Sequence, residues 1–143
     1  MYIHQGDSAG YSCSLIALLN ALRYFGKSTT SPDQDDWQRW LDALGCNRKP
    51  MAKSVEEVAA ILGLVTERVD PSRIDRFPAY VQVVNPEEVG AAIHAVLCIN
   101  KKGGELTLVN YFWRANRQPI WTGTPVFPAR GNPARLAFHL APA

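Results

Sequence analysis

Cys13 stands where a polar loop changes into an apolar helix. The stretch before it, HQGDSAGYS, carries glycines and serines, and the stretch after it, SLIALLNALRYFG, is largely apolar. A thiol attacks as a thiolate, which the N–H groups and the dipole at a helix N-terminus favour. A cysteine taken alone is more often a small buried hydrophobe, but this position predicts a nucleophile. A nucleophilic thiol needs a base close by.

His94 is the best candidate for this base among the three histidines. It opens the segment HAVLCIN directly after NPEEVGAAI, so its side chain is expected at the edge of a sheet, where it can face a cleft. His4 lies in the same loop as the cysteine, with nothing after it to orient an imidazole. His139 alternates with apolar residues in the last predicted strand, so we expect a surface residue or a satisfied structural residue there.

The segment HAVLCINKKGGELTLVNY predicts a β-hairpin whose turn decides which residue faces His94. Asn100 and Gly103 suit the first and last positions of a type I turn, which a left-handed Gly103 extends to a three-residue loop with a bulge. This loop places Asn110 opposite His94 on the same face of the sheet, whereas a four-residue loop would place it on the other face. The amide oxygen of Asn110 is then expected to accept the second imidazole N–H and to orient the base.

Gln5 lies upstream of the cysteine and provides an amide donor. With the main-chain N–H of Cys13, this side chain is expected to donate hydrogen bonds to the oxyanion of a tetrahedral intermediate. The candidate catalytic residues are therefore Cys13, His94, Asn110 and Gln5.

This ordered set resembles the papain-like cysteine peptidases, most closely the bacteriocin-processing family that acts on double-glycine leaders and its stand-alone relatives. The matching features are Gln5, Cys13 at the start of a helix that ends in LRYFG, HAVLC from His94, and Asn110 after a turn that contains glycine. The resemblance implies a papain-like fold and a thiol peptidase that hydrolyses peptide bonds of a peptide or protein substrate. It also implies an acyl-thioester on Cys13, a Cys-His-Asn triad and no cofactor.

Two alternatives to a peptidase stay open. The same triad supports deamidation of a glutamine side chain, or acyl transfer to an amine instead of to water, because only the cleft and the acyl acceptor differ. The fold can also serve as a non-catalytic binding module that has lost turnover. A missing triad residue would favour the binding module, and none is missing here.

Three helices are expected in the first 63 residues. Apolar side chains at helical spacing predict the first over residues 14–26. An N-cap serine followed by proline predicts the second over residues 31–45, which ends at a glycine. A capping box of Ser54 and Glu57 predicts the third, which Gly63 ends.

Strands are expected after residue 64, in the segments FPAYVQVVN, HAVLCIN, ELTLVNYFW, PIWT and RLAFHLA. Helices come first and strands afterwards, without βαβ alternation, which predicts an α+β fold with a largely antiparallel sheet. The papain-like arrangement would pack N-terminal helices on a C-terminal antiparallel sheet, with the helix that follows Cys13 at the centre. No linker or repeat divides the chain, so we expect a single domain over residues 1–143.

Composition excludes several other functions. The 143 residues are 47% hydrophobic and 20% charged with a net charge of +2, and the charges are mixed, so no nucleic-acid partner is expected. No membrane-crossing run or signal peptide is recognisable, so we expect a cytoplasmic protein without a membrane partner. Three cysteines without close pairing predict reduced thiols and no metal site. Cys98 is expected in the core, and Cys46 carries no functional signal.

Overall fold

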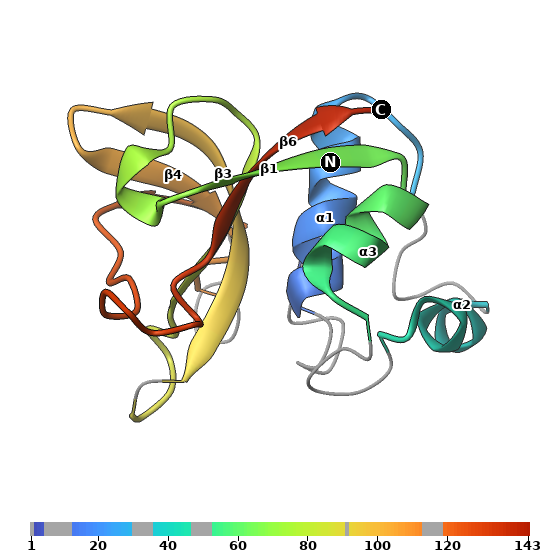
Figure 1. Cartoon of the computed structure of the whole chain (residues 1–143), viewed down its shortest axis with the longest axis horizontal. Coiled ribbons are helices and arrows are strands. Elements are labelled where there is room, and N and C mark those ends of the chain that lie inside the picture. The colour runs from blue at the N-terminus through green and yellow to red at the C-terminus, as the bar shows by residue number, and fades with distance from the viewer. Residues whose placement is uncertain (1, 5–12, 30–35, 47–52, 91, 113–118) are drawn as a thin grey trace.

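The computed structural model of the chain describes residues 2–4, 13–29, 36–46, 53–90, 92–112 and 119–143. Within these ranges, three α-helices accompany a six-stranded antiparallel sheet (Figure 1), which confirms the predicted α+β class. The helices are α1 (Cys13–Tyr24), α2 (Trp37–Leu44) and α3 (Val55–Ile61). The strands are β1 (Leu64–Val69), β2 (Ala79–Val84), β3 (Ile93–Lys102), β4 (Glu105–Val109), β5 (Ile120–Gly123) and β6 (Ala137–Pro142).

The ends of α2 and α3 follow the local chemistry of their sequences. Ser54 Oγ accepts the main-chain N–H of Glu57 at 3.1 Å, and the Glu57 carboxylate accepts the N–H of Ser54 at 3.1 Å, so the predicted capping box is confirmed. Gly45 ends α2 in a left-handed conformation, as predicted. The helix itself begins only at Trp37, and the predicted cap, Ser31, lies outside the described residues.

The strands follow the order β1-β6-β2-β3-β4-β5, and each neighbouring pair is antiparallel. β1 was not among the expected strand segments. It is an edge strand in which only Leu64 is buried, so its sequence, LVTERV, shows little of the apolar pattern that marks a strand. The C-terminal strand β6 lies between β1 and β2 and joins this edge to the centre of the sheet.

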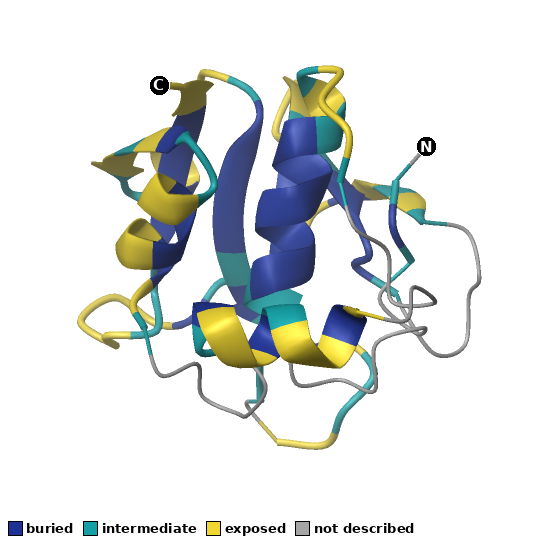
Figure 2. Ribbon diagram, turned by 90° about the vertical axis from the view of Figure 1, so that its right-hand side faces the viewer, coloured by how far each residue is buried: buried dark blue, intermediate teal, exposed yellow. Residues whose placement is uncertain are grey.

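The sheet has a buried core on each face. The core on the α1 side includes Tyr80, Ala95, Leu97, Val109, Phe138 and Leu140. The opposite core includes Val81, Val83, Val96, Cys98, Leu108 and Ala137. α1 packs most extensively on β3. It is buried over most of its length, whereas α2 exposes one side (Figure 2).

The hairpin of β3 and β4 differs from the predicted one at its turn. β3 continues to Lys102, which pairs with Glu105, so the turn consists of Gly103 and Gly104 alone. Both glycines have positive φ values, 65° and 114°, and a two-residue turn of this kind matches the twist of its strands. The predicted three-residue loop is therefore wrong, because two adjacent glycines permit the tighter connection.

A bulge in β3 changes the register again. The pairing shifts by one residue at Ile99, which is an extra residue on β3. Without it, every later residue of β4 would face the other side of the sheet. With it, the last pair is Leu97 with Val109, a register two residues away from the predicted pairing of Asn110 with His94.

Replacement of Gly104 by alanine tests this turn. A φ of 114° is rare for residues with a Cβ atom, so we expect Gly104→Ala to lower the free energy of unfolding by about 1 to 3 kcal/mol. Gly103→Asn is the matched control, because Asn-Gly is a favoured pair in such turns, and its effect should stay within about 0.5 kcal/mol. Urea denaturation measures both changes. A harmless Gly104→Ala would contradict the two-residue turn.

Candidate active site

Cys13 is the first residue of α1, as predicted. Its side chain is half-buried against the α1-side core, whereas the other two cysteines are fully buried. The first turn of α1 carries no acidic side chain, so its N–H groups and its dipole favour a negative charge at this end of the helix. Gln5, the predicted oxyanion donor, lies outside the described residues.

His94 lies near the start of β3 with only 3% of its surface exposed. Its Nε2 atom is 2.7 Å from the main-chain carbonyl oxygen of Asn110. A carbonyl oxygen only accepts hydrogen bonds, so Nε2 carries the proton in this pair and Nδ1 is the basic nitrogen of the neutral ring. The contact therefore selects one tautomer of His94.

Asn110 follows the last residue of β4 and has a φ of 69°. Asparagine adopts this left-handed conformation more readily than most residues. The prediction assigned the contact with His94 to the side-chain amide oxygen of Asn110. In the structure the main-chain carbonyl makes this contact, because the left-handed residue turns the chain out of the strand, and the side-chain amide donates to the carbonyl of Ile3 at 2.9 Å.

The helix that begins at Cys13 packs on β3, the strand that carries His94. Side chains alternate along β3, so that Ala95 contacts the α1-side core and Val96 contacts the opposite core. By this alternation His94 continues the row of Val96, and it pairs with Val83 of β2, which belongs to the same core as Val96.

Ile3 joins α1 to the partner of His94. Its N–H donates to Asn20 Oδ1 at 2.7 Å, and its carbonyl accepts from Asn20 Nδ2 at 3.1 Å. The same carbonyl accepts from Asn110 Nδ2 at 2.9 Å. The helix that begins at Cys13 and the residue that holds the imidazole therefore share one main-chain residue as a partner. Asn20 is not among the predicted site residues, although the sequence marks it as a polar residue within the apolar run LIALLNALRY.

Replacement of Asn20 by alanine tests this clamp. We expect Asn20→Ala to lower the free energy of unfolding by about 2 to 3 kcal/mol, because the buried N–H of Ile3 loses its acceptor. Asn132→Ala is the matched control: Asn132 also accepts a main-chain N–H, from Ala134 at 2.8 Å, but in an exposed position. Water can replace that bond, so we expect a loss below about 1 kcal/mol. Equal losses in urea denaturation would show that the clamp adds no particular stability.

The other two cysteines lie in the cores on opposite faces of the sheet, Cys46 on the α1 side and Cys98 on the other. The expectation that Cys98 is a core residue is confirmed. Burial raises the pKa of each of these two thiols to about 11, so both are protonated at neutral pH. Neither has the character of a reactive cysteine.

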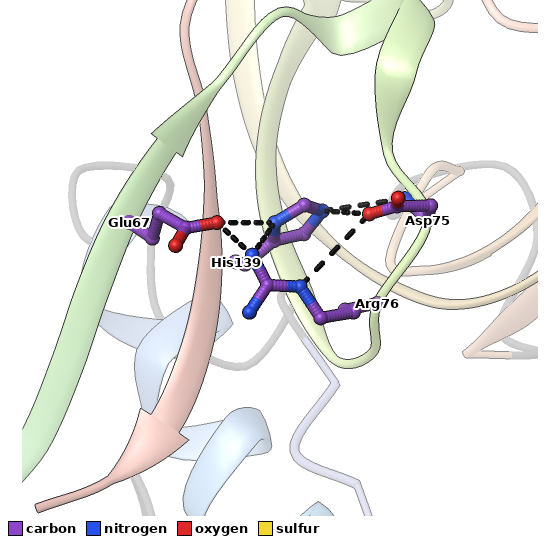
Figure 3. Close-up of polar contacts among 4 residues, drawn as sticks. All are labelled: Glu67, Asp75, Arg76 and His139. Atoms are coloured by element: carbon purple, nitrogen blue, oxygen red, sulfur yellow. Dashed lines mark hydrogen bonds and ion pairs between the residues drawn. The ribbon is translucent and has the colours of Figure 1, made fainter.

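His139 lies in β6 and has polar partners on both ring nitrogens (Figure 3). Nε2 accepts the main-chain N–H of Asp75 at 3.2 Å, so Nδ1 carries the proton and faces the Glu67 carboxylate at 3.3 Å. The guanidinium of Arg76 pairs with the same carboxylate. With 6% of its surface exposed, His139 is confirmed as a satisfied structural residue.

Stability below neutral pH tests the state of His139. Burial, and next the positive charge of Arg76, hold the pKa of this imidazole below its ordinary value of 6.5. The neutral ring therefore contributes stability that is present above the ordinary pKa and is lost as the pH falls through the lower, folded-state value. We expect the free energy of unfolding to fall more steeply from about pH 7 to about pH 5 in the wild type than in His139→Gln. Parallel curves in urea denaturation would contradict this.

Comparison with known proteins adds no family assignment. Neither a scan against protein-family models nor a search of curated proteins finds a match. Among the residues that the structure describes, no group of three or more His, Cys, Asp or Glu side chains could hold a metal ion. In the same ranges, no helix has the length and apolarity needed to cross a bilayer.

Proposed function

We propose that this chain is a papain-like cysteine peptidase that hydrolyses peptide bonds in a peptide or protein substrate. Cys13 is the nucleophile, His94 is the general base and then the general acid, and Asn110 orients the imidazole. The observation that carries the proposal is the 2.7 Å hydrogen bond between His94 Nε2 and the carbonyl of Asn110, two residues that are both almost fully buried. Such a bond holds the ring in the tautomer whose Nδ1 can accept a proton.

The position of the thiol also supports this proposal. Of the three cysteines, Cys13 alone is not fully buried, and it begins the helix that packs on the strand of His94. A helix N-terminus stabilises a thiolate, and a partly exposed sulfur can reach a substrate. Nucleophile, base and orienting group occur in the order Cys, His, Asn along the chain, as in the family that the sequence resembles.

The proposed reaction proceeds through an acyl-enzyme. Nδ1 of His94 takes the thiol proton while Sγ of Cys13 forms a bond to the carbonyl carbon of the substrate. The proton then passes to the departing amine, the C–N bond breaks and an acyl-thioester remains. A water molecule loses a proton to Nδ1 and attacks the thioester carbon. The C–S bond breaks, the acid leaves and the proton returns to sulfur.

Stabilisation of the oxyanion belongs to the same proposal. The main-chain N–H of Cys13 lies at the helix N-terminus, where it has no partner within the helix. In the proposed site this N–H and the side-chain amide of Gln5 donate to the oxyanion of each tetrahedral intermediate. No metal or organic cofactor takes part in these steps.

Selective alkylation tests the nucleophile. With iodoacetamide at neutral pH and mass spectrometry to resolve the sites, we expect Cys13 to react at least about tenfold faster than Cys46 and Cys98, which are buried and protonated. His94→Gln should lower the rate at Cys13 about tenfold or more, because its amide can still donate to the carbonyl of Asn110 but cannot take a proton. Equal rates at the three thiols of the wild type would contradict the proposal.

His139→Gln is the matched control for the histidine variant. It also replaces a buried histidine that has a hydrogen-bond partner, but on a ring whose two nitrogens are occupied by Asp75 and Glu67. We expect the alkylation rate of Cys13 to remain at the wild-type value. A loss equal to that of His94→Gln would indicate a general loosening of the fold rather than removal of a base.

A peptide library separates the peptidase from its rivals. Incubation with the wild type, but not with Cys13→Ala, should split peptides into two fragments. Conversion of glutamine side chains to carboxylates without chain cleavage would favour the deamidase, and amine incorporation would favour the transferase. No chemical change, together with retention of peptides by both proteins, would favour the binding module.

A further inference from the structure

A chain of side-chain hydrogen bonds leads from the first turn of α1 to β2 and beyond. Ser14, which follows Cys13, lies with Oγ 2.9 Å from the Tyr80 hydroxyl. That hydroxyl donates to Gln82 Oε1 at 2.9 Å, and Gln82 Nε2 donates to the carbonyl of Ala134 at 2.9 Å. A phenol has only one hydrogen to donate, so Ser14 is the donor to Tyr80. Every member of the chain therefore has a defined direction.

The hydroxyl of Tyr80 lies in surroundings that are otherwise apolar. The residue is 0% exposed, pairs with Leu97 across β2 and β3, and has its ring 6.1 Å from that of Phe138. Phenylalanine would fill the same space without burying a polar group. The buried Tyr80 hydroxyl therefore needs both of its hydrogen-bond partners. Ser14 can provide one of these bonds only from a narrow range of positions.

Cys13 directly precedes Ser14 in the first turn of α1. Burial is the main cause of the raised pKa of Tyr80; the hydrogen bond from Ser14 lowers this pKa, and negative charges on Cys13 and Glu56 raise it. The next member of the chain, Gln82, pairs with Ala95, the neighbour of His94.

We infer that Tyr80 is a positioning residue for the thiol of Cys13, an inference that rests on the proposed function. By holding Ser14, Tyr80 keeps the first turn of α1 in one place relative to β2 and β3. This series of hydrogen bonds reaches β2 at Gln82, opposite the residue next to His94. It therefore sets the position of the sulfur relative to the strand that carries the base. Displacements of about 1 Å at a reacting group can reduce rates by up to about a hundredfold.

Site-resolved alkylation of Tyr80→Phe and Ser14→Ala tests this role. With iodoacetamide at neutral pH, we expect the rate at Cys13 to fall about tenfold or more in each variant. The rates at Cys46 and Cys98 should remain at the wild-type values, since these thiols lie in the two cores and react only when the fold opens. In one sample, the rate at Cys13 thus reports the position of its thiol, and the rates at Cys46 and Cys98 report loosening of the fold.

Three further variants sharpen the test. Ser14→Thr keeps the hydroxyl and should retain the wild-type rate at Cys13. The alkylation rate at Cys13 in the double variant Ser14→Ala with Tyr80→Phe should be no lower than in the slower single variant, because both substitutions interrupt the same series of hydrogen bonds. Tyr111→Phe is the matched control: Tyr111 is also a buried tyrosine, stacked on Trp121 in the opposite core, and its loss of a hydroxyl should leave Cys13 unchanged.

Each other outcome has one meaning. A wild-type rate at Cys13 in both Tyr80→Phe and Ser14→Ala would overturn the inference and leave the peptidase proposal standing. Faster alkylation of Cys46 and Cys98 would show a structural role and would also overturn it. If Tyr80→Phe does not fold, the half-buried Ser14 at the helix start decides through its alanine and threonine variants. No preference for Cys13 in the wild type would overturn the peptidase proposal, and this inference with it.

Discussion

The main chain of Ile3 is held between α1 and the end of β4 by three hydrogen bonds. Asn20 takes both the N–H and the carbonyl of this residue, and Asn110 shares the carbonyl. Buried main-chain groups have to be hydrogen-bonded. Ile3 can therefore lie between α1 and the end of β4 only if both asparagines are in place. This requirement couples the helix that carries Cys13 to the residue that holds His94. The position of the two halves of the candidate site relative to each other depends on it.

Asn110 serves two partners with two different groups. Its carbonyl meets His94, and its side chain meets Ile3. A residue in the extended conformation would continue β4, whereas the left-handed φ of 69° ends the strand and turns the carbonyl to the imidazole. The tautomer of His94 is therefore set by the backbone conformation of Asn110. The side chain of Asn110 contributes through its conformational preference and through its hydrogen bond to Ile3.

The two buried histidines have different hydrogen-bond partners. His139 has the main-chain N–H of Asp75 on one nitrogen and the carboxylate of Glu67 on the other, so the neutral ring uses both nitrogens. His94 has a carbonyl acceptor on Nε2, which leaves proton uptake to Nδ1. The hydrogen bonds of Tyr80 with Ser14 and Gln82 add a second set of buried polar contacts, which begins at the residue after Cys13.

The sequence by itself determined the α+β class, the helix that begins at Cys13 and the capping box of α3, because local periodicity and capping chemistry depend on neighbouring residues. It did not determine β1, an edge strand with few apolar residues, nor the two-residue Gly103–Gly104 turn, which is shorter than either of the two loops considered from the sequence. Only the tertiary structure decided that a bulge at Ile99 returns the later side chains of β4 to the predicted faces of the sheet. It also decided that Asn110 contacts His94 through its carbonyl, and that Asn20 and Tyr80 anchor α1. These features join residues that are far apart in the chain, and no local pattern records such pairing.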